Sequence, residues 1–288
     1  DVNAVVAGLF AGGADEVHVV DAHGSGNPEP DLLLEQVDPR AEMISRYQAF
    51  RPYVDLSDPG VYDAVAVVGM HAKTGAGGFA SHTYTLGMDF IVNEMSLTET
   101  EIIAYAFGRV DVPVIFASGD DKLEANLQTM PWIVYTRTKD ATSASTVELR
   151  PMDEVHAELR AGAEEALRNR SEARVMKIGT PVKAALRVVP PASLDMLGGV
   201  PGIDLHDGMV EFQAADFGEA YDGIIALMGV ARAGYNSVLM AHVAERYPDA
   251  ASGFTPALVT RWLDVESGRW TPPDPPEPDP NRRFHGAG

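Results

Sequence analysis

The chain has 288 residues, of which 45% are hydrophobic and 22% charged, a composition typical of a globular protein with one large or two modest domains. Its 42 acidic and 22 basic residues give a formal net charge of -20, which repels phosphate backbones and anionic lipids, so we expect neither nucleic acid nor a membrane as a partner. Cysteine is absent, which excludes disulfides and thiolate metal sites, and no apolar run approaches the roughly 20 residues that span a bilayer. We therefore expect a soluble, cytoplasmic protein.

The first 130 residues alternate predicted strands and helices. Apolar residues at helical spacing predict a helix over residues 1–13, and the sequence S-L-T-E from Ser96 to Glu99 is a capping box that begins a helix ending near Gly108. Short apolar runs predict strands over 17–20, 64–69 and 114–117, a strand or hairpin over 84–92, and a short helix or strand through 32–34 and 43–44. A further helix is expected around 123–127. This β-α-β-α-β order predicts an α/β fold with a doubly wound, mostly parallel sheet over residues 1–130.

After Met130 the pattern changes. Short strands are expected over 133–136, 184–189 and 209–213, together with amphipathic helices over 152–169 and 216–232. These elements predict a second, smaller α+β lobe over residues 131–233. A C-terminal helical extension is expected over 234–270, followed by a proline-rich tail over 271–288 that we expect to be disordered.

Two of the predicted strands are followed by histidine, His23 and His71, and a third histidine, His82, follows a glycine-rich loop. Because parallel strands end at one sheet edge, where open α/β sheets bind ligands, we expect the three side chains to lie close together. A lone histidine there is usually an ordinary loop residue, whereas three of them beside Glu99 and Asp21 favour zinc or another divalent ion. The remaining histidines are expected to have no part in such a site: His18, His156, His206, His242 and His285.

Several linked motifs carry a family resemblance. They are Asp21-Ala22-His23, Gly69-Met70-His71-Ala72, Ser81-His82-Thr83, Leu97-Thr98-Glu99, Asp111-Val112-Pro113-Val114, Ser118-Gly119-Asp120-Asp121 and Phe212-Gln213-Ala214. In order and spacing the chain resembles the DppA-type D-aminopeptidases over roughly residues 1–231, which is most of its length.

The resemblance implies a zinc aminopeptidase with two metal ions that removes N-terminal residues, D-amino acids in the founding member, from short peptides. By resemblance His23, His71 and Glu99 are metal ligands, and His82 is a catalytic histidine outside the metal shell. A metal-bound water with a pKa near 7 could attack the amide carbonyl, and His82 could stabilise the oxyanion or pass a proton to the leaving amine. The resemblance also implies a homo-oligomer, a decameric ring with an interior chamber.

The chain departs from the family pattern in two places. The family's Ser-x-Asp-x-Glu-Gly strand, which carries the remaining ligands, has no match here because the chain starts in the following helix, and we expect that strand upstream of Asp1. The family's Ser-Arg-Ser segment is replaced by Ser143-Ala144-Ser145. Two main alternatives therefore stay open: a metallo-aminopeptidase, or a non-catalytic, metal-poor relative that binds peptides or forms a ring. A third is a different metal-dependent amidase on the same scaffold.

Overall fold

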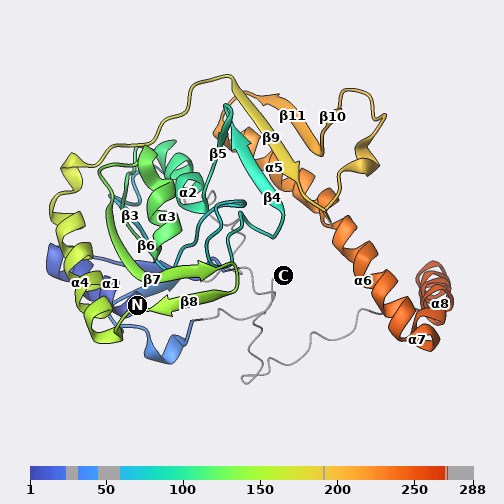
Figure 1. Ribbon diagram of the computed structural model, residues 1–288, viewed down its shortest axis with the longest axis horizontal. Coiled ribbons are helices and arrows are strands. Elements are labelled where there is room, and N and C mark those ends of the chain that lie inside the picture. The colour runs from blue at the N-terminus through green and yellow to red at the C-terminus, as the bar shows by residue number, and fades with distance from the viewer. Residues whose placement is uncertain (24–31, 45–58, 191, 270, 272–288) are drawn as a thin grey trace.

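A mainly parallel sheet lies at the centre of the larger part of the molecule (Figure 1). The computed structural model describes residues 1–23, 32–44, 59–190, 192–269 and 271. The sheet has the order β3-β6-β7-β8. Its strands β3 (Val65–Val67), β6 (Val114–Asp120) and β7 (Val134–Ser143) are parallel, whereas β8 (Thr146–Leu149) pairs antiparallel with β7. A separate parallel pair is formed by β1 (His18–Val20) and β2 (Glu42–Ile44).

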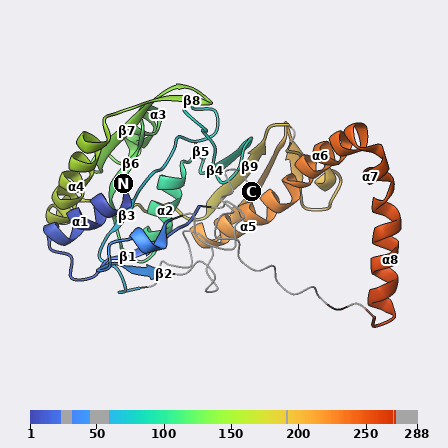
Figure 2. The same cartoon turned by 90° about the horizontal axis from the view of Figure 1, so that it is seen from below.

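Helices cover both faces of this sheet. The helices α1 (Val2–Gly12) and α4 (Met152–Arg168) lie side by side on one face, where Phe116 of β6 packs in one hydrophobic cluster with Leu159 of α4 (Figures 1 and 2). The helices α2 (Glu99–Gly108) and α3 (Asp121–Asn126) contribute to a second cluster, which contains Ala117 of β6. Every residue of β6 is buried, as expected of a strand that is covered on both faces. The predicted doubly wound α/β arrangement is confirmed.

A second, antiparallel sheet forms the smaller lobe. Its order is β10-β11-β9-β4-β5, with β10 (Asp204–His206), β11 (Met209–Ala214), β9 (Val182–Val188), β4 (Met88–Val92) and β5 (Met95–Ser96). Helix α5 (Phe217–Ala231) packs on it, and Phe90, Leu186 and Tyr221 are buried in the shared core. The lobe takes strands from before and after residue 130. The division at residues 130 and 233 stays a prediction.

Two predicted elements have different bounds in the structure. The capping box lies two residues later than predicted, because the hydroxyl that caps α2 is that of Thr98, paired with Glu101. The strand predicted over 133–136 extends to Ser143, since its polar second half forms a partly exposed hairpin with β8 rather than a buried run. Four short 3-10 turns complete the described elements: η1 (Leu34–Gln36), η2 (Leu127–Thr129), η3 (Arg170–Glu172) and η4 (Asp195–Leu197).

The C-terminal helices α6 (Ala233–Arg246), α7 (Pro248–Ser252) and α8 (Phe254–Glu266) form an arm that projects away from both sheets (Figures 1 and 2). No residue of α6 is buried. The helical stretch Phe217–Arg246 is long and apolar enough to cross a membrane by length and composition, which differs from the sequence-based expectation. Its first half, α5, packs in the core of the smaller lobe. The predicted tail lies outside the described residues, apart from Thr271.

Candidate metal centre

Strand β3 leads His71 to the carboxyl edge of the parallel sheet. Gly69 has a φ of 75°, which L side chains rarely adopt, and its N–H donates to the Ser118 hydroxyl at 3.1 Å. The N–H of Met70 donates to the Ser118 carbonyl at 2.9 Å, so the chain leaves β3 along the end of β6. The Nδ1 of His71 lies 3.1 Å from the carbonyl oxygen of Ala72. A hydrogen bond from Nδ1 to this oxygen leaves Nε2 with its lone pair for a ligand.

Helix α2 places Glu99 opposite His71. The Thr98 hydroxyl accepts the N–H of Glu101 at 3.1 Å, while the N–H of Thr98 donates to the Glu101 carboxylate at 2.8 Å, and this box holds the first turn. Glu99 is 7% exposed, and its Oε1 accepts the N–H of Tyr84 at 2.8 Å. The same oxygen lies 3.7 Å from Nε2 of His71. The first turn of a helix favours negative charge, so this position suits a carboxylate.

The loop after β3 returns His82 to the same place. Its ring stacks on that of His71, with centroids 4.0 Å apart and planes 22° from parallel. The N–H of His82 donates to the Ala72 carbonyl at 3.1 Å, and its Nδ1 lies 2.6 Å from the carbonyl oxygen of Ala80. Burial, and after it the charge of His71, lower the pKa of His82. A lowered pKa favours the neutral imidazole, which can accept a proton.

The structure thus brings together three of the four predicted site residues. One ligand atom from each of His71, His82 and Glu99 lies within 4.8 Å of the others, and we call this group the inner cluster. His23 is exposed and not a member, but its charge contributes to the lowered pKa of His82, so it lies in the neighbourhood. The carboxylate of Asp21 accepts the N–H of His23 at 3.0 Å, which holds the turn after β1.

The inner cluster fits a zinc ion. Imidazole nitrogens and a carboxylate oxygen are donors that zinc accepts, and two ligands about 2.1 Å from a tetrahedral ion lie about 3.4 Å apart. The 3.7 Å between Nε2 of His71 and Oε1 of Glu99 is close to that separation. In His71 the other ring nitrogen, Nδ1, lies beside a backbone carbonyl, the kind of contact that orients metal-binding histidines.

A polar residue that sequence reasoning did not single out lies at the end of β6. Asp120 is fully buried, and its Oδ1 accepts the N–H groups of Lys122 and Leu123 at 3.1 and 2.8 Å, which caps α3. Its Oδ2 has no hydrogen-bond partner among the described residues. The motif Ser118-Gly119-Asp120-Asp121 could have pointed to Asp120, because it is one of the motifs that carry the family resemblance, but no role was assigned to it.

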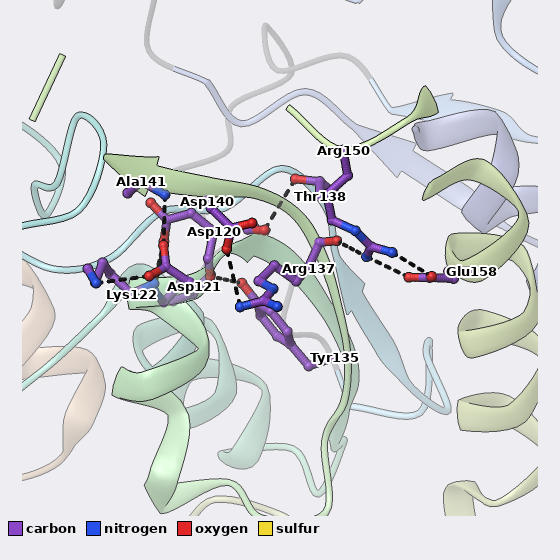
Figure 3. Close-up of polar contacts among 12 residues, drawn as sticks. Asp120, Asp121, Lys122, Tyr135, Arg137, Thr138, Asp140, Ala141, Arg150 and Glu158 are labelled. Atoms are coloured by element: carbon purple, nitrogen blue, oxygen red, sulfur yellow. Dashed lines mark hydrogen bonds and ion pairs between the residues drawn. The ribbon is translucent and has the colours of Figure 1, made fainter. Parts of the chain in front are cut away.

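Further hydrogen bonds hold the end of β6 against β7. Figure 3 shows the Tyr135 hydroxyl donating to the carbonyl of Asp120 at 2.6 Å and the N–H of Ala141 donating to the carboxylate of Asp121 at 2.8 Å. The pKa of Tyr135 is raised, mainly by burial, so this hydroxyl keeps its proton and stays a donor. The strand end that supports the turn before His71 is therefore held against β7.

Comparisons with known proteins find similarity to D-aminopeptidases. A profile of the D-aminopeptidase family matches residues 1–226. The D-aminopeptidase of Bacillus subtilis (strain 168) is 25% identical over 236 residues, which is 80% of this chain and 84% of that protein. The solved structure of the Zn-dependent D-aminopeptidase DppA from Bacillus subtilis, a self-compartmentalizing protease, matches with a TM-score of 0.70 at 24% identity, over 80% of this chain and 84% of that one.

The matched segment contains both sheets and all four predicted site residues, while α6, α7 and α8 lie beyond it. The structural likeness establishes the fold, and the profile, which covers most of the chain, establishes the family. This chain belongs to the D-aminopeptidase family.

Proposed function

We propose that this protein is a zinc-dependent aminopeptidase that removes the N-terminal residue from short peptides, with a D-amino acid as the first candidate for that residue. The observation that carries the proposal is the inner cluster: two imidazoles and a buried carboxylate meet within 4.8 Å at the carboxyl edge of the sheet. The match of residues 1–226 to the D-aminopeptidase family also supports catalysis. The non-catalytic alternative is therefore not favoured.

Each residue of the site has a distinct part in this proposal. His71 and Glu99 hold the metal, with His23 as a further ligand, and the N–H of Tyr84 keeps the Glu99 carboxylate in place. Zinc, when bound, lowers the pKa of a water ligand to about 7 and polarises the scissile carbonyl. His82 would first accept a proton from the attacking water at Nε2, because its Nδ1 lies beside the Ala80 carbonyl, and would then pass that proton to the leaving amine or, while protonated, stabilise the oxyanion.

Metal number and assembly are further parts of the proposal. We expect two zinc ions per chain and a cytoplasmic homo-oligomer, with a decameric ring as the specific expectation. The description of DppA from Bacillus subtilis as self-compartmentalizing supports an oligomer. Sedimentation velocity would measure the assembly, and a monomer at micromolar concentration would contradict this part.

The decisive experiment measures zinc and hydrolysis on the same preparation. Elemental analysis gives zinc per chain, and hydrolysis of a D-alanyl and an L-alanyl dipeptide is followed before and after treatment with a chelator. We expect activity that is lost with the chelator and restored by zinc. A folded protein that holds no zinc and hydrolyses neither peptide would instead be a peptide-binding or ring-forming relative.

A further inference from the structure

A second group of histidine and carboxylate side chains lies at the start of β1 and β2. It consists of Glu16, His18 and Glu42, and one ligand atom from each lies within 4.8 Å of the others. We call this group the outer cluster. His18 opens β1 and stands in register with Glu42, which opens β2. Glu16 lies two residues before His18, so an extended chain brings both side chains to the same face.

The imidazole of His18 is held in one orientation. Its Nε2 faces both carboxylates, 2.7 Å from Glu16 and 3.7 Å from Glu42, and its Nδ1 lies 3.1 Å from the Tyr62 hydroxyl. Tyr62 packs edge-on against His18 and against Phe107, a buried member of the core. The His18 side chain is 21% exposed, whereas those of Glu16 and Glu42 are 71% and 68% exposed. The Nε2 atom of His18 is therefore held in position, whereas the more exposed side chains of Glu16 and Glu42 can move toward an ion.

The donor set selects a class of cation. One imidazole and two carboxylates suit zinc and similar transition ions, whereas calcium and magnesium prefer oxygen ligands throughout. A hydrogen bond from Nδ1 to Tyr62 would leave the lone pair on Nε2, and such outer contacts are typical of metal-binding histidines. The net charge of -20 also raises the local concentration of cations.

We propose that Glu16, His18 and Glu42 bind one divalent transition ion, zinc or a similar metal, at a site separate from the peptidase centre. The ion joins β1 to β2, two strands that pair over three residues each. The two sites are distinct because the two clusters share no residue and because Tyr62, which contacts His18, precedes β3, whereas His71 follows it. The simpler alternative is an ion pair between protonated His18 and Glu16 without metal.

The test counts zinc on the full-length protein after equilibrium dialysis against micromolar free zinc. We expect the double variant Glu16→Gln/Glu42→Gln to hold one equivalent less than the wild type. The double variant Glu148→Gln/Glu172→Gln removes the same charge at other exposed positions and is expected to lose none. Combining Glu16→Gln/Glu42→Gln with Glu99→Gln is expected to lower the zinc count further, because separate sites lose zinc independently.

A second variant tests the orientation of His18 and keeps the packing of the ring. Tyr62→Phe removes the hydroxyl beside Nδ1, and we expect zinc to bind about tenfold more weakly at the outer cluster. Equal zinc counts and affinities in wild type and Glu16→Gln/Glu42→Gln would overturn the proposal in favour of the plain ion pair. Loss of the same equivalent in Glu99→Gln alone, with no further loss in the combination, would overturn the claim of a separate site.

Discussion

The inner and outer clusters combine the same two kinds of side chain within the same 4.8 Å. Their surroundings differ. Glu99 of the inner cluster is buried at the capped start of α2, and His82 is held by backbone contacts from Ala72 and Ala80. The carboxylates of the outer cluster, Glu16 and Glu42, extend into solvent from the starts of two short strands.

The difference separates catalysis from simple metal binding. Burial strengthens electrostatic interactions and fixes the donor atoms before a substrate arrives, which hydrolysis requires. An exposed site can hold an ion but leaves its charge screened by water. We therefore expect changes in the inner cluster to affect activity strongly and equivalent changes in the outer cluster to affect it little.

The largest difference is expected for Glu99→Gln compared with Glu42→Gln. Glutamine keeps the shape and still accepts the N–H of Tyr84, but it loses the charge that holds the ion. We expect kcat/KM for a D-alanyl peptide to fall at least about 1000-fold in Glu99→Gln, which corresponds to about 4 kcal/mol, and by less than about twofold in Glu42→Gln. Similar losses in both variants would mean that burial does not distinguish the clusters.

Replacing His82 should separate metal binding from proton transfer within the inner cluster. We expect His82→Ala to lower kcat about 100-fold to 10,000-fold, the usual range for a positioned acid or base, while zinc per chain stays unchanged. His71→Ala should lose both zinc and activity. If His82→Ala also lost zinc, His82 would be a ligand and not only a catalytic residue.

The close packing around Gly119 of β6, next to the turn that precedes His71, should contribute measurably to the free energy of unfolding. A methyl group on Gly119 would lie 2.5 Å from the Met70 carbonyl oxygen and 2.9 Å from the Tyr135 hydroxyl. We expect Gly119→Ala to lower the free energy of unfolding by about 1–3 kcal/mol in urea titrations. Gly229 of α5 has open space around it, so Gly229→Ala should be neutral or stabilising by up to about 1 kcal/mol. No destabilisation in Gly119→Ala would show that the end of β6 can move.

The smallest effect is expected at the cap of α2. Thr98→Ala removes the hydroxyl that accepts the N–H of Glu101, and we expect it to cost about 1 kcal/mol of unfolding free energy. Thr98→Ser keeps the hydroxyl and should recover most of that loss in the same thermal or urea measurement. A full effect in Thr98→Ser would assign the loss to the missing methyl group in the core instead of the cap.

Much of the fold could be predicted from local patterns. The helices over Val2–Gly12, Glu99–Gly108 and Met152–Arg168 agree with their predicted ranges within a few residues. The first and the third bury one face, which their apolar spacing reflects, whereas every residue of Glu99–Gly108 is buried and this helix was predicted from its capping signal. The capping box was misplaced because S-L-T-E and T-E-T-E both fit the motif from Ser96 onward. Only the position of the helix start relative to the sheet distinguishes them.

The candidate site was predicted from strand ends and from the family resemblance, and three of its four residues meet in the structure. The outer cluster could not be predicted. His18 was expected to have no part in a site. Its neighbour Glu42 belongs to a strand whose register with β1 is not visible in the sequence, so the group could not be recognised there. Asp120 was likewise missed, since burial of its carboxylate depends on contacts made by β6, α3 and the glycine-rich loop.

By itself, the sequence determined most of the secondary structure, the family and the kinds of side chain that follow each strand, because these depend on local spacing and on motifs along the chain. Only the tertiary structure decided which imidazole meets which carboxylate and how deeply each pair is buried. His71 reaches Glu99 because α2 packs against β6, while His18 reaches Glu42 because β1 pairs with β2. Such contacts join distant parts of the chain, and their geometry comes from packing and strand register, which no single segment encodes.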